Sequence, residues 1–575
     1  MGNAEVPWWK RGVFYQVYVR SFADSNRDGI GDLRGITARL DHLAGAQDSL
    51  GVDAVWLTPI YPSPLADCGY DVSDYTAIDP AYGDLDDFDE LLDECHRRGM
   101  KVILDMVLNH TSCEHPWFLE TSSSRDNPRR DWYVWRDGRA PGKPPNRWRS
   151  VMEGSAWAWD EKTGQYYYHA FLPEQPDVNW RNPEARRAML DACRFWLDRG
   201  ADGFRLDFIN YLHEDETLRD NPRKLGWRPY EMQRHVYDRC QPEDHDVVRE
   251  LRSILDGYPG AMMVGETYTD DPEEAASYLG DGTDELHLAF NFDFASTRWS
   301  AAGFQRSVER WEGLIPGEGW PAYFLSNHDM PRHITRLGKR GDADARARVA
   351  AVMLLTLRGT PFLYYGEEIG MPASSVPRRR LRDPVGIRFW PLPVGRDCAR
   401  TPMQWSGEEY AGFSPVEPWL PVDKSFAVRN VARQREDPDS LLAFYRRLIR
   451  LRRDTQALQT GNYRALTSVE GGVFAYLREL DEDRVAVLLN FTPRGLRLDL
   501  SASLGAGIWR TLLSTHGAEG AEVDAANIRL QPDQALILSP RSSNCGQGHV
   551  SDAGEPKDKR GSRDEQAAGR PGCIA

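Results

Sequence analysis

Acidic, amide, imidazole and guanidinium side chains stand at the ends of apolar segments that lie far apart in the sequence. They are Asn109, His110, Arg205, Asp207, Glu266, Asn327, His328 and Asp329. Glycoside hydrolysis requires two carboxyl groups beside the scissile bond, one ionised and one protonated. A single Asp at a strand end is more often a helix cap or a salt-bridge partner. The prediction of an active site therefore depends on these side chains converging in one pocket.

The spacing of Arg205 and Asp207 suggests how the carboxylates divide their roles. A separation of two residues places both side chains on the same side of a strand, and a nearby cation favours the ionised form of a carboxylate. Asp207 is therefore predicted to be an ionised nucleophile. Glu266 is the candidate acid, and neighbouring carboxylates should raise its pKa. Adjacent strands lie about 4.8 Å apart, which suits the closely spaced pair of a retaining mechanism.

A parallel barrel is the architecture that would bring these strand ends together. Short runs rich in β-branched and aromatic residues alternate with amphipathic helical stretches, which predicts an α/β fold with a (β/α)₈ TIM barrel. The expected strands are 12–22, 53–61, 101–110, 202–208, 261–267, 285–292, 321–328 and 360–368. Functional residues of such barrels lie at the carboxyl ends of the strands, where the βα loops form the rim.

The alternation breaks twice, which predicts two additions to the barrel. Residues 111–181 contain a hairpin-like run at 154–171 and indicate a domain inserted after the third strand. The barrel then comprises 1–110 and 182–455. Alternating segments within 456–541 predict a C-terminal antiparallel β-domain. Residues 542–575 are rich in Gly, Ser and charge, and their composition predicts a disordered tail.

Composition and charge exclude several classes of partner. The net charge is −16, which argues against a nucleic-acid surface or binding to an anionic membrane. No run of about 20 apolar residues predicts a membrane span, and the N-terminal sequence does not read as a secretory signal. The eight cysteines lack the spacing of a zinc site, so we expect free thiols. These features predict a cytoplasmic protein, either a monomer or a homodimer.

The ordered motifs resemble those of a known enzyme family. DMVLNH (105–110), GFRLDF (203–208), VGET (264–267) and SNHD (326–329) are similar to the four signature regions of the α-amylase family, glycoside hydrolase family 13. QPDVN (175–179) resembles the variant found in the α-glucosidase and oligo-1,6-glucosidase branch. The resemblance covers essentially residues 8–540.

The resemblance implies a role for each matching position. Asp207 would be the nucleophile, Glu266 the general acid and base, and Asp329 a third carboxylate that binds glucose hydroxyls. The implied substrate-binding residues are Asp67, Tyr70, His110, Arg205, His328 and Arg400. Among them, Asp67 and Arg400 would form an ion pair that closes the glucose pocket, and Tyr70 would form an aromatic platform under the sugar.

The implied activity is that of a retaining, exo-acting α-glucosidase. It would hydrolyse short α-glucosides from the non-reducing end through a glucosyl-Asp207 intermediate, and would also transfer glucose. A dedicated glucosyltransferase or an isomerase such as trehalose synthase would share every catalytic residue and remains an alternative. A non-catalytic relative, like the heavy chains of amino-acid transporters, is disfavoured because all three carboxylates are present and a membrane span is absent from the sequence.

A separate loop could hold a hard cation. Asp24, Asn26, Asp28, Ile30 and Asp32 offer oxygen ligands at alternate positions around a Gly turn, as in an EF-hand loop. The family branch that the sequence resembles places a structural Ca²⁺ or Mg²⁺ there, away from the chemistry. An Asx-rich turn without metal is the alternative. No organic cofactor is expected.

Phe208, the residue after the predicted nucleophile, departs from the resemblance. The branch usually shows Val there in 1,6-preferring enzymes and Thr or Ala in 1,4-preferring ones. Phe208 either packs behind the strand or narrows the site next to the glucose pocket and changes the linkage or acceptor preference.

Overall fold

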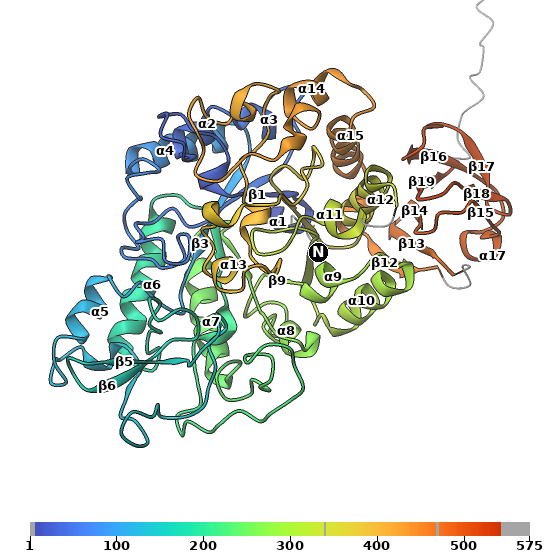
Figure 1. Ribbon diagram of the computed structural model, residues 1–575. Helices are drawn as coiled ribbons and strands as arrows, with labels where there is room; N and C mark the ends of the chain where they lie inside the picture. Colours follow the sequence, from blue (N-terminus) through green and yellow to red (C-terminus); the bar gives the residue numbers. More distant parts are fainter. Residues whose placement is uncertain (1–5, 339–340, 467–470, 542–575) are drawn as a thin grey trace, which may run out of the picture. The chain divides into compact units, whose positions relative to one another are not determined.

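Eight parallel strands close into a barrel in the structure, a computed structural model that describes residues 6–338, 341–466 and 471–541 (Figure 1). The barrel strands are β1 (Phe14–Val17), β2 (Ala54–Leu57), β3 (Lys101–Met106), β7 (Gly203–Leu206), β8 (Met262–Gly265), β9 (Leu288–Phe290), β10 (Trp320–Phe324) and β11 (Thr360–Tyr364). The predicted TIM barrel is confirmed. Each strand overlaps its predicted range but is shorter, because the last residues of each range belong to the rim loops.

Amphipathic helices connect the strands. In α4 (Leu85–Arg97), Asp84 and Asp87 form a capping box, and Phe88 and Leu91 are buried at helical spacing. The other long helices are α6 (Pro183–Asp198), α7 (Pro242–Leu255), α10 (Ala301–Leu314), α12 (Ala343–Thr356) and α15 (Leu441–Asp454). The short helices are α1 (Trp8–Arg11), α2 (Leu33–Thr37), α3 (Leu40–Leu43), α5 (Pro116–Thr121), α8 (Pro272–Ser277), α9 (Phe292–Ser296), α11 (His333–Gly338), α13 (Pro384–Arg388), α14 (Val431–Glu436), α16 (Gln456–Thr460) and α17 (Ser501–Leu504).

A small antiparallel sheet interrupts the barrel between β3 and α6. Its strands are β4 (Trp135–Arg136), β5 (Trp157–Asp160) and β6 (Gln165–Tyr168), in the order β4-β6-β5. The hairpin predicted at 154–171 is formed by β5 and β6. An isolated bridge pairs His110 with Asp177, so the end of the inserted segment lies against the loop that follows β3.

The C-terminal strands form an antiparallel sheet in the order β12-β13-β14-β19-β16-β17, and β15 pairs with β18. They are β12 (Asn462–Ala465), β13 (Val473–Leu480), β14 (Asp483–Asn490), β15 (Leu496–Leu498), β16 (Ile508–Ser514), β17 (Glu522–Asp524), β18 (Ile528–Leu530) and β19 (Ala535–Pro540). Phe474 and Tyr476 join the main core, whereas Ala475 and Leu477 belong to a separate core. This period of two buries both faces of the sheet.

Three further predictions concern the cysteines, the C-terminal tail and membrane spans. The six cysteines in the described ranges are free, whereas Cys545 and Cys573 lie outside them. The predicted disordered tail, 542–575, also lies outside the described residues. No helix within the described residues combines the length and apolar character needed to cross a membrane. The described residues up to Pro540 form one compact unit.

Candidate active site

A cavity of about 270 Å³ lies at the carboxyl ends of the barrel strands, where the sequence predicted the site. One set of lining residues, here called the polar wall, comprises Asp67, Tyr70, His110, Asp207, Glu266, His328, Asp329 and Arg396. A second set, the apolar wall, comprises Val151, Met152, Phe171, Phe208, Tyr268, Phe292, Met330, Val385 and Val394. All three predicted carboxylates therefore meet in one cavity.

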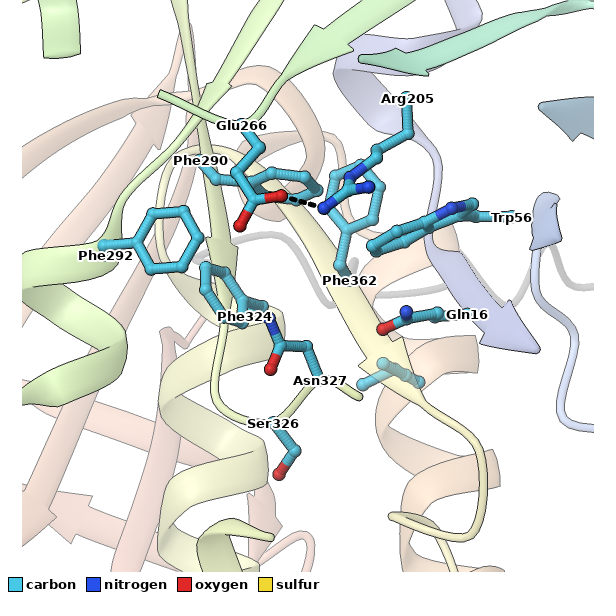
Figure 2. Close-up of a pocket in the computed structure, with 11 residues that line it drawn as sticks. Gln16, Trp56, Arg205, Glu266, Phe290, Phe292, Phe324, Ser326, Asn327 and Phe362 are labelled. Carbon is cyan, nitrogen blue, oxygen red and sulfur yellow. Dashed lines mark hydrogen bonds and ion pairs between the residues drawn. The ribbon is translucent and has the colours of Figure 1, made fainter. Parts of the chain in front are cut away.

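Arg205 lies beneath the cavity and connects the acidic side chains. Its Nη1 donates to Asp207 Oδ1 at 2.8 Å and to Asp105 Oδ1 at 2.5 Å, and its Nη2 donates to Glu266 Oε2. Figure 2 shows the bond to Glu266 above a small void bordered by the rings of Phe290, Phe292, Phe324 and Phe362. Arg205 is buried, so these bonds are charge-assisted and shielded from water. One guanidinium thus holds three carboxylates.

The register of two strands places the catalytic candidates side by side. Arg205 pairs with Val264 and Leu206 with Gly265 across β7 and β8. The amide of Glu266 donates to the carbonyl of Leu206 at 2.9 Å, so Asp207 and Glu266 leave adjacent strands at the same level. Both side chains are buried. Their positions match the sequence prediction.

The charge state expected for Asp207 was wrong. Burial raises the pKa of the Asp207 carboxyl to about 8; Arg205 opposes this, whereas Asp105, Asp329 and Asp67 add to it. Burial outweighs the Arg205 guanidinium, so the surroundings of Asp207 favour its protonated form in the enzyme without substrate.

Asp329 behaves in the opposite way. Burial alone would raise the pKa of its carboxyl, but His328, Arg396 and Arg400 outweigh burial and hold the pKa well below its usual value. Arg400 Nη2 donates to Asp329 Oδ1 at 2.7 Å, and His328 Nε2 lies 2.9 Å from Oδ2. The cavity therefore contains one carboxylate whose neighbours favour the ionised form and one, Asp207, whose burial favours the protonated form.

The ion pair predicted between Asp67 and Arg400 was also wrong. The partner of Asp67 is Arg396, whose Nη2 donates to Asp67 Oδ1 and whose Nε donates to Asp383 Oδ1 at 2.8 Å. Arg400 instead binds Asp329 and does not line the cavity. The motif GRDCARTPMQW (395–405) contains both arginines four residues apart, and the course of its loop determines which of them reaches Asp67.

Two buried histidines are held by side chains that the sequence did not single out. Gln16 Nε2 donates to His328 Nδ1 at 2.8 Å, which leaves the ring proton on Nε2. That Nε2 lies 2.7 Å from Tyr70 Oη. Gln175 Nε2 lies 2.9 Å from His110 Nε2, which is also 3.1 Å from the carbonyl oxygen of Tyr70. Burial lowers the pKa of His110 to about 4, so its ring is neutral at physiological pH.

Phe208 lines the cavity and does not pack behind its strand. Its backbone is left-handed, with φ 39° and ψ 46°. The ring contacts Phe171, with 4.7 Å between centroids, and Tyr268, with 5.6 Å. The sharper of the two sequence hypotheses, a role beside the glucose pocket, is the one that this position favours.

The predicted cation loop is held by its own hydrogen bonds. Asp24 accepts from the amides of Arg27 and Gly29, at 2.7 and 2.9 Å, and Asp32 caps α2 through the amide of Gly35. Within the described ranges, no group of three His, Cys, Asp or Glu side chains is placed to hold a metal ion. The predicted ligands also include the Asn26 amide and a main-chain carbonyl, so the cation site stays a prediction.

The barrel, the inserted sheet and the paired carboxylates at the rim define a barrel glycoside hydrolase. The family model of the α-amylase catalytic domain matches residues 16–461, and the chain belongs to that family. A probable α-glucosidase of Rhizobium meliloti (strain 1021) is 42% identical, over 86% of this chain and 91% of the relative. An oligo-1,6-glucosidase of Parageobacillus thermoglucosidasius is 38% identical, over 93% and 99%. The crystal structure of the α-glucosyl transfer enzyme XgtA superposes with a TM-score of 0.87 at 41% identity, covering 93% of this chain and all of XgtA.

Proposed function

We propose that this enzyme is a retaining α-glucosidase that removes single glucose units from short α-glucosides. The observation that carries the proposal is the bridge from Arg205 to both Asp207 and Glu266. The two carboxyl groups share one guanidinium and leave adjacent strands at the same level, which is compatible with the spacing of about 5–5.5 Å in retaining enzymes, against about 6.5–9.5 Å in inverting ones. The names of the relatives support the α-glucoside as substrate.

The first step requires a protonated Glu266 and an ionised Asp207. Glu266 gives that proton to the glycosidic oxygen while Asp207 attacks the anomeric carbon, so the bond from that carbon to the leaving oxygen breaks. The aglycone leaves as an alcohol, and Asp207 becomes a glucosyl ester. In the second step Glu266 takes a proton from water, whose oxygen attacks the anomeric carbon and releases Asp207. Both carboxylates then regain their starting states.

Exo attack follows from the pairing of Asp67 with Arg396. Both side chains line the cavity, and Arg396 is also held by Asp383, so the pair is a fixed barrier on the glucose side. A glucose ring bound among Asp67, His110 and Asp329 therefore has no room for a further sugar beyond its 4-hydroxyl. Only the terminal unit of an α-glucoside is then cleaved.

Transfer of glucose to an alcohol is the second candidate activity. The likeness to XgtA, which its title describes as an α-glucosyl transfer enzyme, favours it. Hydrolysis and transfer share the glucosyl ester and differ in whether water or another hydroxyl takes the glucose.

Proton NMR of the glucose first released from methyl α-glucoside tests the mechanism, because this substrate yields a single glucose whose anomeric form is set by the enzyme. We expect α-glucose to appear first and to mutarotate afterwards; first-formed β-glucose would contradict a retaining mechanism. Chromatography of the same reaction separates free glucose from new glucosides and from isomers of the substrate.

The cytoplasmic location stays a proposal, supported by the six free thiols among the described residues.

A further inference from the structure

A second hollow lies between the inserted segment and the long loop that follows β7. It has a volume of about 510 Å³, and its lining residues come from 139–155 and 220–233. None of the described residues lines both this hollow and the active-site cavity. Small-molecule sites have volumes of about 300–1,000 Å³, so the hollow is large enough for a ligand of its own. We call it the basic groove.

The basic groove carries a charge opposite to that of the chain, whose net charge is −16. Six of the described side chains that line it are charged, and one of them is acidic: Arg139, Arg147, Arg149, Asp220, Arg223 and Lys224. Arg147 Nε lies 3.7 Å from Asp220 Oδ2, and Lys224 Nζ lies 2.8 Å from Asp270 Oδ2. The other three cations have no ion-pair partner among the residues that the structure describes: Arg139, Arg149 and Arg223. A cleft lined by one sign of charge concentrates counter-ions, so the groove should attract anions.

Asn221 adds a buried hydrogen-bond donor to the groove. The residue lines the groove and is 5% exposed. Its Oδ1 accepts from the amides of Val236 and Tyr237, both at 3.1 Å, which fixes the orientation of the side-chain amide. Its Nδ2 is buried and has no hydrogen-bond partner among the described residues. A buried donor of this kind is destabilising unless a ligand or an ordered water accepts from it, so this part of the groove requires an acceptor atom.

The two segments that form the groove are tied to each other. Gln233 Nε2 donates to the carbonyl of Arg147 at 2.8 Å, and Gln233 Oε1 accepts from the amide of Arg149 at 3.1 Å. Trp148 Nε1 donates to the carbonyl of Arg219 at 2.8 Å. The groove is therefore formed before a ligand binds, and little free energy is lost in ordering it.

We propose that the basic groove binds a small molecule that carries a diphosphate group, at a site separate from the active site. The three unpaired guanidinium groups match the charge of about −3 that two linked phosphates carry near pH 7. Guanidinium groups bind phosphate oxygens through paired N–H donors, and Asn221 supplies one more donor. Apolar lining residues can cover the organic part of such a ligand: Pro144, Leu225, Pro229 and Met232.

An acidic surface of another protein fits the groove less well. Such a surface could reach Arg139, Arg149 and Arg223, which are exposed. It would not reach Asn221, which is 5% exposed. A small ligand enters the hollow and meets both kinds of donor.

Isothermal titration calorimetry of the full-length enzyme with inorganic pyrophosphate and inorganic phosphate tests the site. Both titrations are made without divalent cations, which pyrophosphate binds, and at one ionic strength set with sodium chloride, so that screening is equal. We expect one pyrophosphate per chain and a Kd at least tenfold lower than the Kd for phosphate. The reason is that the second phosphate group contacts guanidinium groups that a single phosphate leaves unpaired.

Two variants remove one cation from each segment of the groove. Arg149→Gln and Arg223→Gln should each raise the Kd for pyrophosphate about tenfold to hundredfold, the effect of one charge-assisted hydrogen bond. Arg306→Gln is the matched control, because Arg306 is an exposed residue of α10 that does not line the groove. It changes the net charge by the same amount and should change the Kd less than twofold.

Asn221→Asp tests the buried donor. The variant keeps an oxygen for the amides of Val236 and Tyr237 but replaces Nδ2 with a second carboxylate oxygen, which repels an anion. We expect binding of pyrophosphate to become undetectable. Thermal melting checks that the variant is folded; if it is not, the two arginine variants still decide the outcome.

Three results would overturn the inference. They are the absence of pyrophosphate binding at millimolar concentration, equal Kd values for pyrophosphate and phosphate, and an equal loss of affinity in Arg149→Gln and Arg306→Gln. Any of them would mean that the groove is a solvated basic surface or a contact for an acidic protein. The proposed α-glucosidase activity does not depend on this site and would stand in each case.

Discussion

The two walls of the cavity are held in place by different forces. Polar-wall residues are tied to one another and to buried arginines, as when Arg396 binds Asp67 and Arg400 binds Asp329. Apolar-wall residues are held mainly by packing, as when Phe208 contacts Phe171 and Tyr268. A bonded network fixes position and charge, whereas packed side chains tolerate changes of shape. The polar wall should therefore control the rate on every substrate, and the apolar wall should control the choice among substrates.

Replacing the nucleophile should produce the largest effect. Asp207→Asn keeps the size of the side chain but removes the atom that forms the glucosyl ester. We expect kcat to fall by about 10³–10⁵-fold on all glucosides, in the range seen when a covalent nucleophile is lost. Steady-state rates on methyl and benzyl α-glucoside check this. A loss confined to one of them would contradict the division between the walls.

Neutralising the closing ion pair should have a smaller but uniform effect. Asp67→Asn leaves Arg396 bound to Asp383 and removes the charge that we propose Asp67 presents to the glucose unit. We expect kcat/KM to fall by about 10²-fold, the value of one buried charged hydrogen bond. The fall should be equal for the methyl and benzyl compounds, since both carry the same glucose. A changed ratio of the kcat/KM values for the benzyl and methyl compounds would mean that the polar wall also contributes to the choice of aglycone.

The raised pKa of Asp207 should make the melting temperature of the protein depend on pH. That pKa is about 8 in the folded protein against an ordinary 3.8. Between these values the folded chain keeps a proton that the unfolded chain releases, so this group's contribution to the free energy of unfolding declines as pH rises toward 8. Asp207→Asn mimics the protonated carboxyl. We expect the variant to raise Tm by about 2–5 °C at pH 8.5 and by less at pH 5.

Calorimetry at the two pH values measures that difference. Asp329→Asn is the contrasting variant, because the pKa of Asp329 is held well below its usual value. It should lower Tm at both pH values, since it removes a charge that Arg400 requires. A Tm gain from Asp329→Asn would show that the two carboxylates do not differ in charge state.

The loop at 24–32 lies outside both walls and should affect neither. If Asp24, Asp28 and Asp32 bind Ca²⁺ as the sequence predicts, a chelator should lower Tm by about 2–4 °C while the benzyl-to-methyl ratio stays constant. Calorimetry with and without EDTA, with Asp28→Asn as the matched variant, checks this. A Tm that does not respond to EDTA would favour the Asx turn that its hydrogen bonds form.

The sequence predicted the barrel because each strand carries its own local pattern, and it predicted the carboxylates because they follow those strands. It did not predict contacts that depend on loops. Arg396 and Arg400 have the same chemistry and stand four residues apart, so only the folded loop distinguishes them. Asp105 was missed because it lies inside β3 and binds Arg205 in the barrel. The pKa of Asp207 depends first on the burial of its carboxyl and then on the charges that the folded chain places around it, which the local sequence does not contain.

The hydrogen bonds from Arg205 to Asp105, Asp207 and Glu266 have a consequence for the whole reaction cycle. In the proposed mechanism, Asp207 and Glu266 together carry one proton and one negative charge before substrate binds. In the glucosyl ester Asp207 would be neutral and Glu266 would have lost its proton, so the charge of this pair would again be minus one, while Asp105 stays bound to the same guanidinium. The surrounding dipoles therefore stabilise the same net charge before substrate binds and in the glucosyl ester, so they need not reorient between these two states. Arg205 is thus a fixed counter-ion to a negative charge that moves from Asp207 to Glu266 without changing in magnitude.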